Sequence, residues 1–263
     1  MEKANDFFEF AAQVGLTKHI GGLEASEELF ELCHIGKGNY VLDVGCGAGV
    51  TPVLLVKGRN CRVMGVDISK GMVQRSRERA DREGLGDRIE VRVADAQELP
   101  FEDDTFDAVI TESVTAFPAD KQKAVQEYVR VTKPGGYVGL NESTWLQLPP
   151  PPELIAWASN DLGANATPLS SGEWKGLLEN AGLKDISTRI SEIDLKREAR
   201  GVMRRYGFGG MIRVMYRMLS LYRKSTKYRE FLSKVKKEGL APHNLNEYFG
   251  YGMYVGRKLH LHQ

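Results

Sequence analysis

The chain has 263 residues, of which 42% are hydrophobic and 27% are charged, a composition typical of a globular protein with one α/β domain. It contains no run of about 18 apolar residues and no basic-then-apolar leader, so we expect a cytoplasmic protein without a transmembrane helix. Cys33, Cys46 and Cys61 form no CxxC pair, which argues against a disulfide framework and a cysteine zinc site.

The net charge of +1 hides an uneven distribution. Residues 196–237 hold 14 Lys and Arg but only two acidic residues, Glu198 and Glu230, so this segment carries +12 and the remainder −11. Such a segment is expected to meet something acidic. Four partners remain open: the body of the protein, an anionic substrate, a membrane surface and a nucleic acid.

Short apolar strands alternate with helices in the first half of the chain. After N-terminal helices in residues 1–37, the pattern predicts strands at 40–44, 62–66, 89–93, 106–110 and 137–141. Helices are predicted between them, at 49–57, 69–83 and 119–131, and a turn at 133–136 precedes the fifth strand. Ser69 suits a helix N-cap. This alternation predicts a parallel sheet with helices on both faces.

The second half of the chain is less regular. Four prolines at 149–152 predict a stiff turn into a helix at 153–160, followed by a helix at 170–180 and strands at 186–193 and 248–255. The basic segment is helical by pattern, with one face formed by Met211, Met215, Met218 and Tyr222. That face could pack on the sheet, form a homodimer or lie on an anionic membrane.

These elements predict a single domain over residues 1–263. The Rossmann-like core would comprise 38–193 and 246–259, and helical insertions at 145–168 and 194–245 would form a cap over the substrate.

The most informative motif is VLDVGCGAGV, in which Gly45, Gly47 and Gly49 stand where a strand turns into a helix. Glycines at this place allow the backbone to approach a ligand closely. The spacing is GxGxG, whereas dinucleotide sites favour GxGxxG. Asp43, just before the loop, could accept a hydrogen bond from an ammonium group.

Two further carboxylates follow the next strands. Asp67 ends the second strand, 22 residues after Gly45, where a carboxylate can bind both hydroxyls of a ribose. Asp95 ends the third strand and could bind an adenine amino group, with the amide of Ala96 as a companion donor. The carboxyl ends of parallel strands are where open α/β sheets bind ligands.

The motifs VLDVGCGAGV, GVDIS, ADAQELPF, FDAV and KPGGYVGL together resemble the class I S-adenosylmethionine-dependent methyltransferases over residues 38–142. With HIGGLEASEELFEL before the first strand, the chain is most similar to the small-molecule branch that contains the ubiquinone/menaquinone biosynthesis C-methyltransferases. The resemblance implies a seven-stranded, mostly parallel sheet with an antiparallel last strand. It implies S-adenosylmethionine as cofactor and S-adenosylhomocysteine as product. The implied cofactor contacts are Asp43, Gly45, Cys46, Gly47, Gly49, Asp67, Ile68, Met72, Asp95, Ala96 and Glu112.

Methyl transfer from a sulfonium mainly requires alignment and exclusion of water, so a catalytic base is optional. His19 and Glu112 are the candidates for such a base; Glu112 could equally be a structural carboxylate. Cys46 is interpreted as a small buried residue rather than a nucleophile. His260 and His262 have no further ligands nearby in the sequence, so we expect no metal site and read them as a tail.

Trp145, Trp157 and the methionine face suit a hydrophobic or aromatic small-molecule acceptor, such as a quinone- or lipid-like compound. The fourth strand is followed by TESV, residues 111–114, where amino-methylating nucleic-acid enzymes usually carry an Asn/Asp-Pro-Pro-aromatic motif. Two alternatives stay open: an RNA methyltransferase that uses residues 196–237, and a noncatalytic scaffold that binds S-adenosylmethionine.

Overall fold

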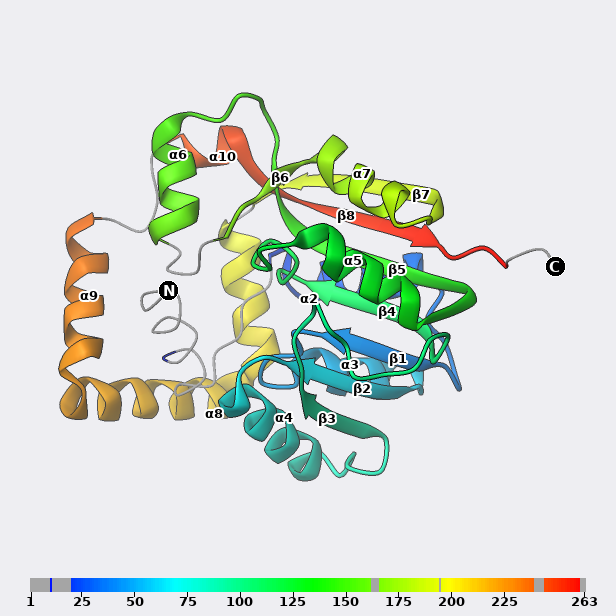
Figure 1. Cartoon of the computed structure of the whole chain (residues 1–263). Coiled ribbons are helices and arrows are strands. Elements are labelled where there is room, and N and C mark those ends of the chain that lie inside the picture. The colour runs from blue at the N-terminus through cyan, green and yellow to red at the C-terminus, as the bar shows by residue number, and fades with distance from the viewer. Residues whose placement is uncertain (1–9, 11–19, 162–165, 194, 239–243, 261–263) are drawn as a thin grey trace.

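A computed structural model of the chain describes residues 10, 20–161, 166–193, 195–238 and 244–260 (Figure 1). Its sheet has the strand order β3-β2-β1-β4-β5-β8-β7, with the short strand β6 paired to β5. Strands β1 to β5 run parallel, and β8 runs antiparallel to both β5 and β7. The strands are β1 (Tyr40–Val44), β2 (Arg62–Asp67), β3 (Ile89–Val93), β4 (Phe106–Glu112), β5 (Thr132–Trp145), β6 (Leu169–Ser170), β7 (Lys184–Glu192) and β8 (Phe249–Arg257).

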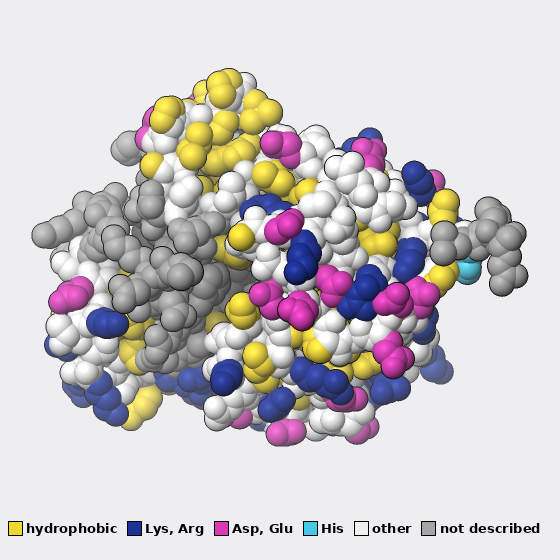
Figure 2. Space-filling view, viewed as in Figure 1, with side chains coloured by type: hydrophobic (Ala, Val, Ile, Leu, Met, Phe, Trp, Pro, Cys, Tyr) yellow, Lys and Arg dark blue, Asp and Glu magenta, His cyan; other side chains and the backbone are white. Residues whose placement is uncertain are grey.

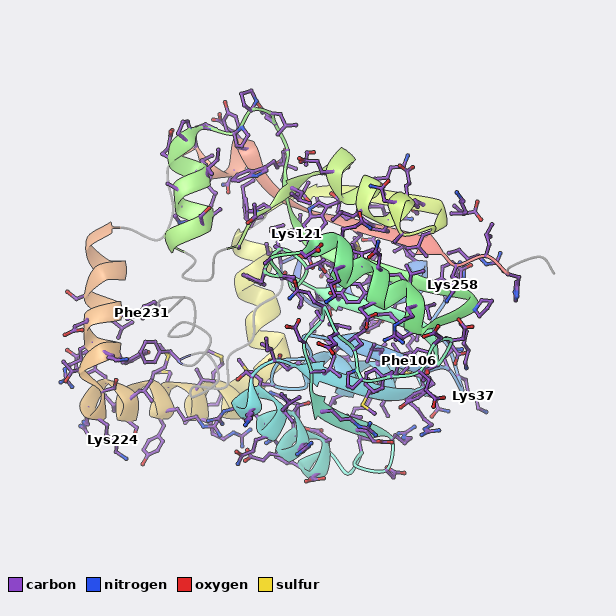
Figure 3. The ribbon with its side chains drawn as sticks, in the orientation of Figure 1. Lys37, Phe106, Lys121, Lys224, Phe231 and Lys258 are labelled. Carbon is purple, nitrogen blue, oxygen red and sulfur yellow. The ribbon has the colours of Figure 1, made fainter. Side chains whose placement is uncertain are left out.

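Helices cover both faces of the sheet because alternate strand residues point to opposite sides. Val41 joins the core formed with α2, α3 and α4, whereas its neighbour Leu42 joins the core formed with α5 and α7. Phe106 is fully buried in the second core (Figure 3). These helices are α2 (Gly22–Leu32), α3 (Val50–Arg59), α4 (Lys70–Arg82), α5 (Lys121–Val131) and α7 (Ser171–Asn180).

Polar side chains fix three helix starts. The Ser69 hydroxyl accepts a hydrogen bond from the Met72 amide at 3.3 Å, which confirms the predicted cap of α4. Asp120 caps α5. The Ser170 side chain and Glu173 form a capping box at α7.

The remaining helices lie beside the ends of β1 to β5, which we call the carboxyl edge of the sheet (Figure 1). They are α6 (Pro152–Ala156), the π-helix η1 (Trp157–Asp161), α8 (Leu195–Lys224), α9 (Thr226–Glu238) and α10 (Leu245–Tyr248). The predicted helix at 153–160 is thus two short helices. Among the described helices, none is long and apolar enough to cross a membrane.

The structure corrects the predicted methionine face. Helix α8 consists of two helices joined across a kink at Gly207, and Val214 rather than a methionine is the buried residue of its second half. Met211 and Met218 are half-buried, whereas Met215 is 65% exposed and Tyr222 49% exposed. The predicted stripe is therefore divided between a covered side and an exposed side of the helix.

Seven strands form the continuous path of the sheet, as predicted, and the two-residue β6 pairs off this path with the end of β5. Two further expectations need correction. The predicted turn at 133–136 is part of β5, since the Gly135 amide donates to the Lys258 carbonyl oxygen at 2.6 Å. His260, expected in a tail, lies against Gly135, and His262 is outside the described residues.

Candidate cofactor site

The glycine loop between β1 and α3 is wedged between two neighbouring elements. Gly45, Gly47 and Gly49 have φ values of 74°, 52° and 77°, which side chains rarely adopt. A Cβ atom on Gly45 would lie 2.2 Å from the Val114 Cγ2 atom, and one on Gly49 would lie 2.5 Å from the Ser76 Oγ atom. The loop therefore requires glycine for both backbone conformation and space.

Asp43 is a buried carboxylate at the carboxyl end of β1. Its side chain is 2% exposed, and its Oδ2 atom has no hydrogen-bond partner among the described residues. Burial raises the pKa of Asp43 well above its usual range, and the nearby charges of Glu112 and Asp67 raise it further. A bound cation would stabilise this carboxylate, so the site suits the ammonium group of S-adenosylmethionine.

Asp67 ends β2 and is held by the glycine loop. Its Oδ2 atom accepts a hydrogen bond from the Gly47 amide at 3.0 Å, and its Oδ1 atom accepts one from the Ser69 amide at 2.8 Å. Burial raises the pKa of Asp67, while the two amide hydrogen bonds oppose that effect. A carboxylate has about four acceptor positions, so both oxygens can still accept from ribose hydroxyls.

Two apolar side chains beside Asp67 are exposed to solvent. Ile68 is 72% exposed and Val93, the register partner of Asp67 on β3, is 45% exposed. An exposed apolar pair at this position can pack against a flat ring. Ile68 was predicted from the sequence, whereas Val93 was not. The signal for Val93 is a valine that directly follows the exposed Arg92.

Asp95 and Ala96 follow β3, as predicted. Asp95 Oδ1 accepts a hydrogen bond from the Gln97 amide at 2.8 Å, which fixes the carboxylate in a turn. Ala96 is half-buried against the core. Met72 is only 4% exposed and packs on Ala48 of the glycine loop, so its main contact is with protein. Contact of these residues with adenine stays a prediction.

Glu112 links three elements beneath the carboxyl edge. Its Oε2 atom accepts a hydrogen bond from the Ser26 hydroxyl of α2, and Oε1 accepts one from the Thr51 hydroxyl of α3, both at 2.8 Å. The carboxylate therefore holds α2 and α3 against β4, and its service as a catalytic base stays a prediction. The other candidate base, His19, lies outside the described residues.

Two hydrogen bonds hold Ile20 against β4 and β5. The Ile20 amide donates to the Ser113 hydroxyl at 3.2 Å, and the Asn141 side-chain amide donates to the Ile20 carbonyl oxygen at 2.9 Å. These bonds connect Ile20 to the residue after β4 and to β5.

Glu142 is a buried polar residue of the site that was not predicted from the sequence. It is fully buried on β5, and its Oε1 atom accepts hydrogen bonds from the amides of Val114 at 2.9 Å and Thr115 at 2.7 Å. Burial raises the pKa of Glu142, and these bonds oppose the effect. The carboxylate fixes the turn after β4, in which Ser113 has a φ of 59°. A lone acid after the apolar run YVGL was the available signal.

Cys46 behaves as a small buried residue of the loop. It is 6% exposed, and burial raises the pKa of its thiol well above the usual range, with Asp43 and Asp67 adding to the effect. A neutral thiol is a poor nucleophile.

Several known proteins are similar to this chain in sequence. A methyltransferase domain family matches residues 42–140. An uncharacterised protein from Haemophilus influenzae is 30% identical over 209 residues, which cover 78% of this chain and 82% of that protein. The 27-O-demethylrifamycin SV methyltransferase of Amycolatopsis mediterranei is 31% identical over 163 residues, 60% of this chain and 59% of that protein.

Among solved structures, the S-adenosylmethionine-dependent methyltransferase from Geobacter sulfurreducens in complex with S-adenosyl-L-homocysteine has a TM-score of 0.71. It is 20% identical and covers 95% of this chain and 97% of that one, so it has the same fold. Fold and site together define a Rossmann-like methyltransferase. The chain belongs to the class I S-adenosylmethionine-dependent methyltransferases, and its cofactor is S-adenosylmethionine.

Proposed function

We propose that this enzyme transfers a methyl group to a small hydrophobic or aromatic acceptor. The observation that carries the proposal is an aromatic cluster at the carboxyl edge. Trp145 ends β5 and is the register partner of Phe249, and the two rings meet edge-on with centroids 5.5 Å apart. The Trp157 ring also meets the Phe249 ring edge-on, with centroids 5.5 Å apart. A relative that acts on 27-O-demethylrifamycin SV also supports a small-molecule acceptor.

Figure 2 shows hydrophobic side chains gathered over α6 and α10, beside this cluster. Leu154 is fully buried there, whereas Leu148 is 63% exposed and Ile155 46% exposed. Removal of such apolar surface from water would favour binding of an apolar acceptor.

S-adenosylmethionine supplies an electrophilic methyl group on a sulfonium. Within the proposal, Asp43 and Asp67 hold the cofactor, and the aromatic cluster keeps water away from the acceptor, which favours in-line transfer. For an oxygen or carbon acid, a base must remove a proton, and Glu112 and His19 remain the candidates.

We also propose that α8 contacts an anionic membrane from which a lipid-like acceptor could enter. Exposed apolar side chains follow one side of the helix, with Phe208 79% exposed and Tyr216 74% exposed. Exposed cations stand at its end, among them Lys224 (Figure 3) and, on α9, Lys227. An apolar stripe flanked by cations is the composition of a helix that lies in a lipid interface. A homodimer through this face stays a prediction.

The cofactor site can be tested by calorimetric titration with S-adenosylhomocysteine. Asp67→Ala should weaken binding at least about 100-fold, because two hydrogen bonds to a charged group are lost and each contributes about 1.5–3 kcal/mol. The matched control is Asp87→Ala, which removes an exposed aspartate from the turn before β3 and should leave affinity unchanged. A folded wild-type protein that does not bind the ligand would refute the assigned site.

The acceptor can then be sought by measuring S-adenosylhomocysteine formation with aromatic and lipid-like compounds. Turnover with these compounds supports the proposal. Cofactor binding together with methylation of RNA, and steeply salt-dependent RNA affinity, would favour the RNA alternative. Binding without turnover on any acceptor would favour the noncatalytic scaffold.

A further inference from the structure

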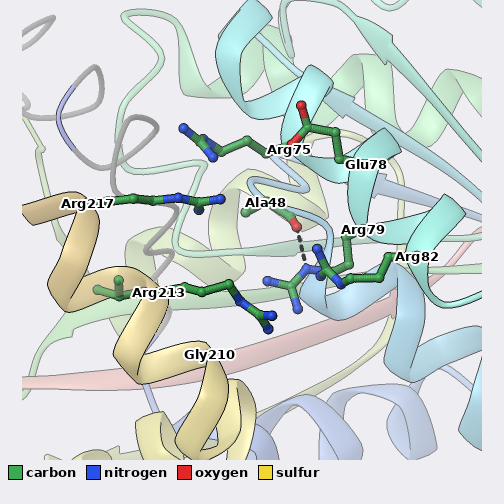
Figure 4. Close-up of a pocket in the computed structure, with 9 residues that line it drawn as sticks. Ala48, Arg75, Glu78, Arg79, Arg82, Gly210, Arg213 and Arg217 are labelled. Atoms are coloured by element: carbon green, nitrogen blue, oxygen red, sulfur yellow. Dashed lines mark hydrogen bonds between the residues drawn. The ribbon is translucent and has the colours of Figure 1, made fainter. Parts of the chain in front are cut away.

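A pocket rich in arginine lies between α4 and α8 (Figure 4). Helix α4 contributes three arginines and α8 contributes two, while Glu78 is the single carboxylate among the nine lining residues. The arginines are Arg75, Arg79, Arg82, Arg213 and Arg217, and the remaining lining residues are Ala48, Gly210 and Val214.

Helical geometry places these side chains together. Positions 75, 79 and 82 recur at intervals of four and three, so they share one side of α4, and positions 213 and 217 share one side of α8. The kinked α8 passes α4 with this side turned toward it (Figure 4). More than one hundred residues separate the two helices in the sequence, so the pocket exists only in the folded chain.

The arrangement concentrates like charges in a partly buried space. Arg79 donates from Nε to the carbonyl oxygen of Ala48 at 2.7 Å, which holds its guanidinium at the glycine loop. Burial lowers the pKa of Arg75, and the charge of Arg217 lowers it further. Convergent guanidinium groups repel one another, and a bound anion would turn this repulsion into attraction.

Arginine is particularly suited to phosphate. Its planar guanidinium presents donors in a fork that matches two oxygens of one phosphate, and the charge strengthens each hydrogen bond. Donors that approach from two helices can surround a phosphate group from opposite sides.

We infer that the pocket between α4 and α8 binds the phosphate or diphosphate group of a ligand, through Arg213 and Arg217 of α8 and the arginines of α4. The ligand is either a soluble phosphorylated molecule or the headgroup of an anionic lipid. Ala48 of the glycine loop borders the pocket, but none of the five arginines is among the residues assigned to the cofactor, and the inference does not rest on the proposed acceptor.

The test uses inorganic pyrophosphate as the probe, titrated calorimetrically into the full chain saturated with S-adenosylhomocysteine. The double variant Arg213→Gln/Arg217→Gln should bind pyrophosphate about 100-fold more weakly, because two charged donors are lost. The matched control is Lys175→Gln/Lys184→Gln, which removes the same charge from exposed positions on α7 and β7 and should change the affinity less than about twofold.

A second variant, Arg217→Lys, keeps the charge but removes the fork, and should weaken pyrophosphate binding about tenfold. The melting temperature and S-adenosylhomocysteine affinity of each variant show whether it is folded. The inference is overturned if wild-type protein does not bind pyrophosphate or if both double variants lose equal affinity. If pyrophosphate binds the cofactor-free protein but no longer binds at saturating S-adenosylhomocysteine, the inference is also overturned, because the arginines would then serve the cofactor.

Vesicles distinguish the two sources of the phosphate. The protein is sedimented with phosphatidylcholine vesicles that contain phosphatidate. If the pocket variant loses more binding than the control variant, and pyrophosphate competes with the vesicles, the ligand is a lipid headgroup. If pyrophosphate binds in the pocket while both variants sediment equally, the ligand is a soluble phosphorylated molecule.

Discussion

The carboxyl edge of the sheet and the second half of α8 are both polar regions of one enzyme, but they are built in opposite ways. At the carboxyl edge, Asp43 and Glu142 are buried carboxylates, and Glu142 accepts hydrogen bonds from two backbone amides. On α8, arginines converge in a pocket and large apolar side chains such as Phe208 face solvent.

This contrast predicts which property each kind of substitution should change. A cofactor site requires side chains that are held in place before the cofactor binds. Such side chains lower the free energy of unfolding when they are buried and charged. An exposed apolar and basic surface contributes little to folding, and the proposed role of the surface on α8 is contact with a membrane. Changes at the carboxyl edge should therefore alter stability, whereas changes on α8 should alter association.

The largest effect is expected from Gly45→Ala. The new Cβ would lie within 3.1 Å of three Val114 side-chain atoms and would require an L-residue at a φ of +74°, so we expect a loss of about 2–4 kcal/mol in unfolding free energy. Gly38→Ala is the matched control, because Gly38 has a φ of +84° but no atom within 4 Å of the added Cβ. Urea denaturation measures both. Equal losses would show that steric contact with Val114 is unimportant.

An intermediate effect is expected from Asp43→Asn, and it should depend on pH. The raised pKa means that the folded protein binds a proton more tightly than the unfolded chain. The wild-type protein therefore loses stability as pH rises from the usual carboxyl range toward the raised pKa, and the variant should not.

The variant avoids the cost of burying the charged carboxylate. At pH 8 Asp43→Asn should therefore melt about 2–4 °C above wild type for each kcal/mol of that cost. The difference should vanish near pH 4, about the ordinary pKa of an aspartate. Its S-adenosylhomocysteine affinity should fall. Thermal melts between pH 4 and pH 8 check this, with the exposed Asp87→Asn as control. A variant less stable than wild type at pH 8 would show that the charge of Asp43 is compensated.

The smallest effect on stability is expected from Met215→Ser/Tyr222→Ser on the exposed side of α8, within about 0.5 kcal/mol of wild type. Cosedimentation with anionic vesicles should nevertheless weaken about tenfold, because apolar area that would enter the lipid interface is lost. The control Ile190→Ser/Leu259→Ser removes exposed apolar residues elsewhere. Equal vesicle binding by all three proteins would contradict membrane contact through α8.

Local sequence patterns determined much of the fold and the cofactor site. The alternation of strands and helices from Tyr40 to Val131, the cap at Ser69 and the position of Asp67 at the end of β2 follow from short-range periodicity, capping and turn chemistry. The glycine loop is also determined locally, because its positive φ values require glycine whatever elements surround the loop.

Contacts between residues that are distant in sequence become visible only in the folded structure. Nothing local distinguishes Glu142 as the acceptor for amides 27 and 28 residues earlier, or pairs Val93 with Asp67. Periodicity placed the methionines of α8 on one face, but which side is buried depends on the neighbours supplied by the fold. The arginine pocket likewise arises from two helices that are remote in sequence, since packing and electrostatics act through space while propensity acts along the chain.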